Sequence, residues 1–146
     1  MINWLHMEDG YCEGCFKAVF FRDDENGDEL TVMAKSPELR AGAEKCVEAL
    51  NGLTDSQIDE ICKSIINHLK ENGMDEEFDL SQLDDFRGIL NCCWFTTLYV
   101  NMLSEEDETD YVLEGEGDWG DVIGIVVNNG KLIYVGNDYF EYMKEE

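Results

Sequence analysis

The spacing of apolar residues predicts two consecutive helices in the middle of the chain. Apolar side chains recur every three or four positions over residues 39–50 and again over residues 58–69. This is the spacing of residues that share one face of a helix. Asn51-Gly52 follows the first run and Asn72-Gly73 follows the second, and both pairs are typical of helix C-termini. We therefore expect a helical hairpin with a short connection.

Residues that suit helix N-termini precede both runs. Ser36 offers an N-cap before Pro37, which suits the first helical position. Thr54, with Gln57 three residues later, matches a capping box. These caps agree with the two helices that the spacing of apolar residues predicts.

Runs rich in aromatic and β-branched residues lie on both sides of the helices and predict strands. Residues 16–21 and 30–34 are two such runs, and the polar stretch between them contains Asn26-Gly27, so we expect a β-hairpin there. Further runs follow the helices at residues 94–103, 111–113, 122–127 and 131–135. Asn128-Asn129-Gly130 separates the last two and is the strongest hairpin signal in the chain.

These elements predict an α+β fold in a single domain, residues 1–146. We expect an N-terminal β-hairpin, two or three helices, and then about four mostly antiparallel strands that form one sheet packed on the helices. The third helix would cover residues 81–91. The pattern leaves open whether these residues are helical, and it also leaves the order of the strands open.

Charge is the strongest departure from an ordinary composition. The chain has 34 acidic and 10 basic residues, a formal net charge of −24. So much like charge destabilises a compact state, and solubility requires far less. It predicts a basic protein partner. Direct nucleic-acid binding is disfavoured, because phosphate contacts require a basic surface.

The acidic residues are concentrated. Lys and Arg are absent between Arg87 and Lys131, and two further acidic runs lie at residues 71–85 and 23–29. Nine carboxylates fall in the interval without basic residues: Glu105, Glu106, Asp107, Glu108, Asp110, Glu114, Glu116, Asp118 and Asp121. We predict that these nine residues and Trp119 form the binding surface. Trp119 is either a loop aromatic folded onto the sheet or an interface anchor, a role in which Trp is enriched.

Six cysteines raise a metal or redox alternative. Cys12 and Cys15 have the spacing of zinc ligands, and Cys92-Cys93 could supply two more. Adjacent cysteines, however, point poorly at one ion, and Cys12 and Cys15 face opposite sides of a regular strand. A redox pair would instead open a helix. We expect no bound metal and no cofactor.

Other site classes find little support in the sequence. Asp23–Asp28 resembles a calcium loop, but its ligand positions do not match. Phosphate-loop, dinucleotide, esterase and zinc-protease motifs are absent. His68 lies near the predicted end of the second helix, where a partly charged imidazole is favoured.

The sequence has neither a secretory signal nor an apolar stretch of membrane-spanning length, so we expect a cytoplasmic protein without a membrane partner.

Short motifs at both ends resemble those of a group of small uncharacterised bacterial α+β domains. The motifs are Trp4, Gly10-Tyr11, Glu13-Gly14 and Phe20-Phe21 at the N-terminal end, and residues 118–125, Asn129-Gly130-Lys131 and Val135-Gly136 at the C-terminal end. The acid and the His that usually follow the Trp in that group are absent here. Some of its relatives are regarded as immunity proteins of polymorphic toxin systems, which implies inhibition of a toxin.

We therefore predict a non-enzymatic, acidic binding protein, an immunity-type inhibitor of a basic partner such as a toxin. Two alternatives remain at this point: a zinc- or thiol-dependent protein that uses Cys12 and Cys15, and a DNA-mimic inhibitor. Mimicry would require carboxylates in two rows that match the phosphates of a duplex. The identity of the partner and the oligomeric state are open.

Overall fold

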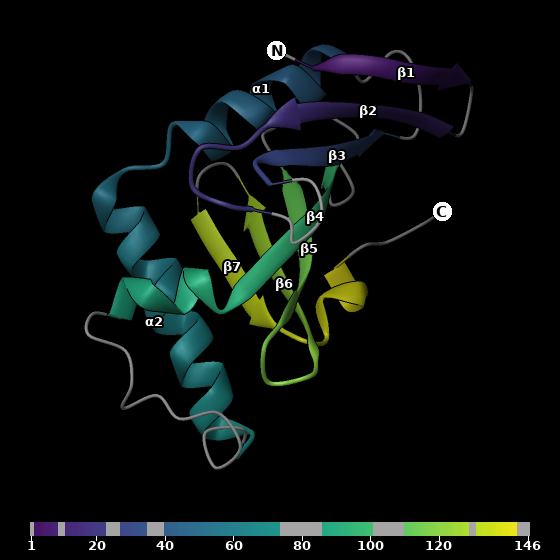
Figure 1. Ribbon diagram of the computed structural model, residues 1–146. Helices are drawn as coiled ribbons and strands as arrows, with labels where there is room; N and C mark the ends of the chain where they lie inside the picture. The colour runs from purple at the N-terminus through teal and green to yellow at the C-terminus, as the bar shows by residue number, and fades with distance from the viewer. Residues whose placement is uncertain are drawn as a thin grey trace.

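The computed structural model describes residues 2–8, 11–22, 27–34, 40–73, 86–100, 110–128 and 131–142. Seven strands in these ranges form one sheet, and their order across the sheet is their order along the chain (Figure 1). They are β1 (Asn3–Glu8), β2 (Tyr11–Lys17), β3 (Glu29–Ala34), β4 (Cys93–Val100), β5 (Tyr111–Gly117), β6 (Val122–Asn128) and β7 (Lys131–Gly136). The helices are α1 (Arg40–Asn51), α2 (Asp55–Glu71) and the 3-10 helices η4 (Phe86–Asn91) and η5 (Tyr139–Tyr142).

One parallel pairing, between β3 and β4, joins two antiparallel units of the sheet. Thr31 pairs with Thr97, Val32 with Leu98, and Met33 with Tyr99. β1–β3 and β4–β7 are each antiparallel throughout. A parallel pair needs a long crossover connection, and α1, α2 and η4 lie in the connection between β3 and β4.

The two α-helices pack on one side of the sheet and bury its apolar face (Figure 1). Alternate residues of the central strands point into this core, among them Phe95 and Leu98 of β4 and Leu113 of β5. Ile65 of α2 is fully buried against them. Full burial of one such aliphatic side chain contributes about 1.5–3 kcal/mol, so this cluster is the main source of stability.

Both predicted helices are present. α1 carries its buried residues on one face, as the spacing indicated. The side chain of Thr54 accepts a hydrogen bond from the backbone of Gln57, whose side chain accepts one from the backbone of Thr54, which confirms the capping box. Ser36 and Pro37 lie outside the described residues. No helix in the described part of the chain is long and apolar enough to cross a membrane.

The predicted fold is wrong in its sheet. The structure is mostly strand, a seven-stranded mixed sheet, rather than a hairpin, two or three helices and about four further strands. β1 was not predicted, because its exposed residues show no clear alternation. β2 covers residues 11–17 rather than 16–21. Phe21 is apolar and buried in the core, but it lies beyond the end of the strand. Of the predicted third helix, residues 86–91 form a 3-10 helix and residues 81–85 lie outside the described ranges.

Both edge strands contain an extra residue that interrupts their pairing. In β1 the register shifts at Leu5, and in β7 it shifts at Ile133. These two side chains are 64% and 47% exposed. Bulges in edge strands discourage pairing with strands of another molecule. The structure therefore protects both ends of the sheet against edge-to-edge association.

The capping box predicts the outcome of a simple substitution. Thr54→Ala removes the acceptor for the Gln57 amide, and we expect a loss of about 1 kcal/mol in the free energy of unfolding, measured by urea denaturation. Thr54→Ser keeps the hydroxyl and should match the wild type. Equal stability of the Ala and Ser variants would contradict this role.

Candidate functional site

The structure places the predicted acidic binding residues in quite different environments. Glu105, Glu106, Asp107 and Glu108 lie outside the described residues. Of the other six predicted residues, Asp110 directly precedes β5, and the rest lie along β5 and the turn that connects it to β6. Asp110 and Trp119 are buried, Glu114 and Asp121 are half-buried, and Glu116 and Asp118 are exposed. These six residues thus belong to one hairpin and the residue before it. Only two of the acids are exposed, so the exposed acidic surface is smaller than the predicted binding surface.

Glu114 accepts hydrogen bonds from two tyrosines on the face of the sheet opposite the α-helices. The Tyr139 hydroxyl donates to Oε2 over 2.8 Å, and the Tyr99 hydroxyl donates to Oε1 over 3.4 Å. Burial, followed by the hydrogen bond to Glu114, raises the pKa of Tyr139. Tyr139 belongs to η5 and packs with Val112 and Val126 in a second, smaller apolar cluster. Glu114 therefore fastens η5 to the sheet.

Trp119 folds back onto the sheet and is 8% exposed. Its ring lies against Gly117, where a Cβ atom would collide with it. Gly120 follows with a φ of 90°, a conformation that other residues rarely adopt, and it turns the chain into β6. Of the two interpretations offered for Trp119, a loop aromatic folded onto the sheet or an interface anchor, the first describes the position of this side chain in the free protein.

His68 is a buried histidine at the C-terminal end of α2 and is 7% exposed. Its Nδ1 lies 3.1 Å from the side-chain nitrogen of Asn72, which also donates to the His68 carbonyl oxygen over 2.8 Å. A Cβ at Gly136 would collide with the Tyr134 hydroxyl and lie 3.2 Å from Nδ1, so the glycine leaves room for both rings. Burial lowers the pKa of His68. The ring is therefore held neutral, which corrects the expectation of a partly charged imidazole.

Carboxylates from three separate parts of the chain act electrostatically on His68. Asp121, Glu71 and Asp138, in that order of effect, counteract the lowering of its pKa by burial. Asp121 accepts hydrogen bonds over 2.8 Å from the backbone of Val122 and from the side chain of Asn137. We call Glu71, Asp121 and Asp138 the acidic pole. Of these three residues, only Asp121 was predicted to belong to the binding surface, because nothing in the local sequence indicates that residues 71, 121 and 138 act on the same histidine.

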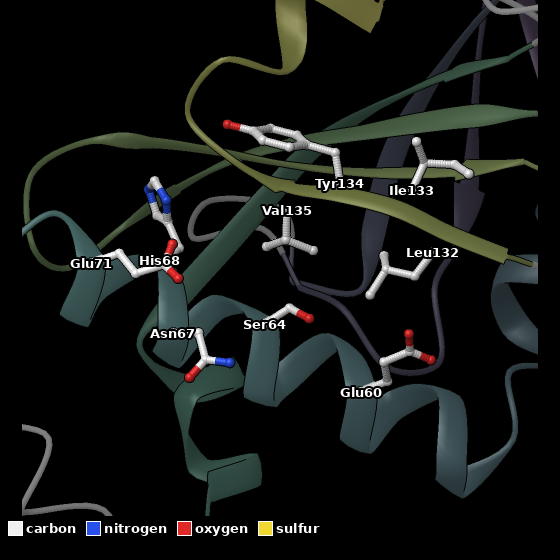
Figure 2. Close-up of a pocket in the computed structure, with 9 residues that line it drawn as sticks. All are labelled: Glu60, Ser64, Asn67, His68, Glu71, Leu132, Ile133, Tyr134 and Val135. Atoms are coloured by element: carbon white, nitrogen blue, oxygen red, sulfur yellow. The ribbon is translucent and has the colours of Figure 1, made fainter.

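A groove of about 360 Å³ runs between α2 and β7 (Figure 2). Glu60, Ser64, Asn67, His68 and Glu71 line it from the helix, and Leu132–Val135 line it from the strand. These five helical residues share one face of α2, because each is three or four positions from another member of the set. The groove therefore has a carboxylate toward each end of its helical wall and neutral polar groups between them.

Cys12 and Cys15 lie on opposite faces of β2. Cys12 is fully buried and its thiol donates to the Glu8 carbonyl oxygen over 3.4 Å. Cys15 is half-buried, and burial together with Glu29 raises the pKa of its thiol. A raised pKa reduces the thiolate fraction that metal binding and nucleophilic attack require. Within the described ranges, no group of three or more His, Cys, Asp or Glu residues could hold a metal ion.

Cys92 and Cys93 each interact with the turn of η4 just before them. The Cys92 thiol donates to Gly88 O over 3.7 Å and the Cys93 thiol to Ile89 O over 3.2 Å. Burial raises the pKa of both thiols. The two groups are placed as small side chains at the start of β4 rather than as a reactive pair.

The fold and the groove define a small acidic protein built on a seven-stranded mixed sheet. The chain belongs to the family described as a domain of unknown function, DUF6985, whose model matches residues 2–142. Comparison with curated proteins and with solved structures gave no match. The family model thus covers nearly the whole chain. The family description states no function, so the function of this protein has to be inferred from the site.

The neutral burial of His68 predicts a pH dependence of stability. Because its pKa is lowered in the folded state, the unfolded chain binds the proton more readily. The stability that depends on the neutral ring is complete above about pH 6.5 and is lost as the pH falls from there toward the lower folded pKa. We expect the free energy of unfolding to fall more between pH 7 and pH 5.5 in the wild type than in His68→Gln. Parallel curves for the two proteins, or an NMR titration of His68 above pH 6.5, would contradict this.

Proposed function

We propose that this protein is a non-enzymatic, acidic binding protein, an immunity-type inhibitor that neutralises a basic partner such as a toxin. The observation that carries the proposal is the net charge of −24, with carboxylates of the acidic pole gathered from α2, the β5–β6 turn and the segment after β7. Such a concentration of one sign of charge favours an oppositely charged partner.

The β5–β6 turn and the acidic pole offer exposed negative charge on neighbouring parts of the surface. Glu116 is exposed near the end of β5, Asp118 is exposed on the turn that follows, and Asp121 at the end of the turn belongs to the pole. A field of this kind raises the rate of encounter with a cationic protein by about 10–10³-fold at low salt. The first contribution of this surface is therefore to the association rate.

Trp119 has a supporting role in this proposal rather than that of an exposed anchor. Its ring is buried against Gly117 and holds the turn that presents Asp118 and Asp121. The turn is also fixed by the Asp118 amide, which donates to the Cys92 carbonyl oxygen over 2.8 Å. A rigid turn presents its carboxylates without the entropy loss of ordering them on binding.

The two alternatives receive less support from the geometry. Cys12 and Cys15 point away from each other, so they offer no shared site for zinc or for a disulfide exchange reaction. A DNA mimic needs exposed rows of carboxylates, but Asp110 is buried and Glu114 is engaged by two tyrosines. The acids of β5 therefore do not form a continuous exposed row.

The proposal is tested by pull-down with the products of neighbouring genes, followed by kinetics on the partner that is captured. We expect the association rate constant to fall as salt increases. Glu116→Lys/Asp118→Lys should lower it about threefold to tenfold at low salt, and the difference should shrink at high salt. Glu29→Lys/Glu48→Lys, the same charge change at exposed positions in β3 and α1, is the matched control and should have a smaller effect. Failure to capture a partner, or binding indifferent to salt and to both pairs, would refute the proposal.

A further inference from the structure

We propose that the groove between α2 and β7 binds a short extended segment of the basic partner, with two Lys or Arg side chains that pair with Glu60 and Glu71. This inference rests on the proposed function and adds the place and the chemistry of a specific contact. The groove is lined by both glutamates, and both are exposed.

The spacing of the two glutamates sets the spacing of the basic residues. Glu60 and Glu71 are separated by eleven positions, a rise of about 16 Å along the helix, and point in nearly the same direction. In an extended chain, residues four positions apart share a face and lie about 13 Å apart. The long side chains of Lys and Arg span the difference. The geometry thus favours a basic residue, three intervening residues, and a second basic residue.

The middle of the groove suits an uncharged side chain. Figure 2 shows Leu132 and Val135 pointing toward α2, with Ser64 opposite them on the helix. The aliphatic stems of Lys or Arg can pack along the two strand residues while their charged ends reach the carboxylates. The third residue of the segment, which points to the same side as the basic residues, would meet Ser64 and Val135.

The two ends of the groove differ in electrostatic strength. Glu71 also belongs to the acidic pole, whose members Asp121 and Asp138 act on the neighbouring His68. A cation at this end is attracted by several carboxylates, whereas Glu60 lies eleven residues away along α2. We therefore assign the stronger of the two basic contacts to the Glu71 end.

The bulge in β7 decides how the segment is held. The extra residue Ile133 shifts the register of this edge strand, which disturbs the regular row of backbone groups that an added strand needs. Side-chain contacts in the groove, rather than a regular eighth strand, accordingly carry the recognition.

The test uses a capped synthetic peptide, Arg-Ser-Val-Ser-Arg, with the whole protein, and follows backbone amide shifts by NMR. We expect the largest shifts around residues 132–135 and along the groove face of α2. Glu60→Gln/Glu71→Gln should raise the Kd about threefold to tenfold, since exposed ion pairs contribute modestly. Glu29→Gln/Glu48→Gln, at exposed positions outside the groove lining, should leave the Kd within about twofold of the wild-type value.

Two further measurements separate the groove from general charge attraction. The peptide Arg-Arg-Val-Ser-Ser has the same charge with different spacing and should bind more weakly. Ser64→Trp fills the groove and should abolish the shifts, while circular dichroism reports whether the fold is kept. Equal binding of both peptides, or shifts spread over the acidic surface and unchanged in Glu60→Gln/Glu71→Gln, would overturn the proposal.

These experiments distinguish failure of the groove proposal from failure of the proposed inhibitor function. If a captured partner binds Glu60→Gln/Glu71→Gln and a folded Ser64→Trp as tightly as the wild type, the groove proposal is wrong and the proposed function stands. If no basic partner is captured but the spaced peptide still binds in the groove, the proposed inhibitor function is wrong and the groove is a peptide site.

Discussion

The parallel pairing of β3 with β4 is the constraint on which the rest of the structure depends. An antiparallel pair could be closed by a tight turn, but a parallel pair requires the chain to return across one face of the sheet. α1 and α2 lie in that return connection and supply the apolar layer that covers the sheet. Because α2 then runs alongside β7, the same crossover also builds one wall of the groove.

The acidic residues serve several purposes, and this changes the meaning of the net charge. Glu114 accepts hydrogen bonds from Tyr99 and Tyr139, and Asp59 accepts one from Arg87 over 2.6 Å. These carboxylates hold elements together within the protein. Glu116, Asp118 and the acidic pole remain at the surface or near it. The case for a basic partner therefore depends on where the charges lie. The net charge of the sequence overstates the acidic surface that a partner could contact.

Local signals in the sequence were sufficient for the helices and for the last hairpin. The Thr54 capping box and the pairing of Asn128 with Lys131 are contacts between residues at most three positions apart, so the residues that make them are visible together in the sequence. The β3–β4 pairing, the contact of His68 with Gly136, and the acidic pole join residues more than sixty positions apart at their widest. Periodicity describes which face of an element is buried, but it does not name the element packed against it. The groove could not be predicted from the sequence, because it depends on α2 packing beside β7.

The acidic surface and the groove act over different distances, and this difference is what can make a charged protein selective. At physiological salt the Debye length is about 8 Å, so a partner senses the summed field only when it is already close. Glu60 and Glu71 are about 16 Å apart along α2, which is twice that length. Each glutamate is then sensed separately, and the spacing of basic residues in the partner matters more than their number. In the proposed complex, the field of the acidic pole would increase the frequency of encounters, whereas the two separated contacts in the groove would discriminate among the basic segments that arrive.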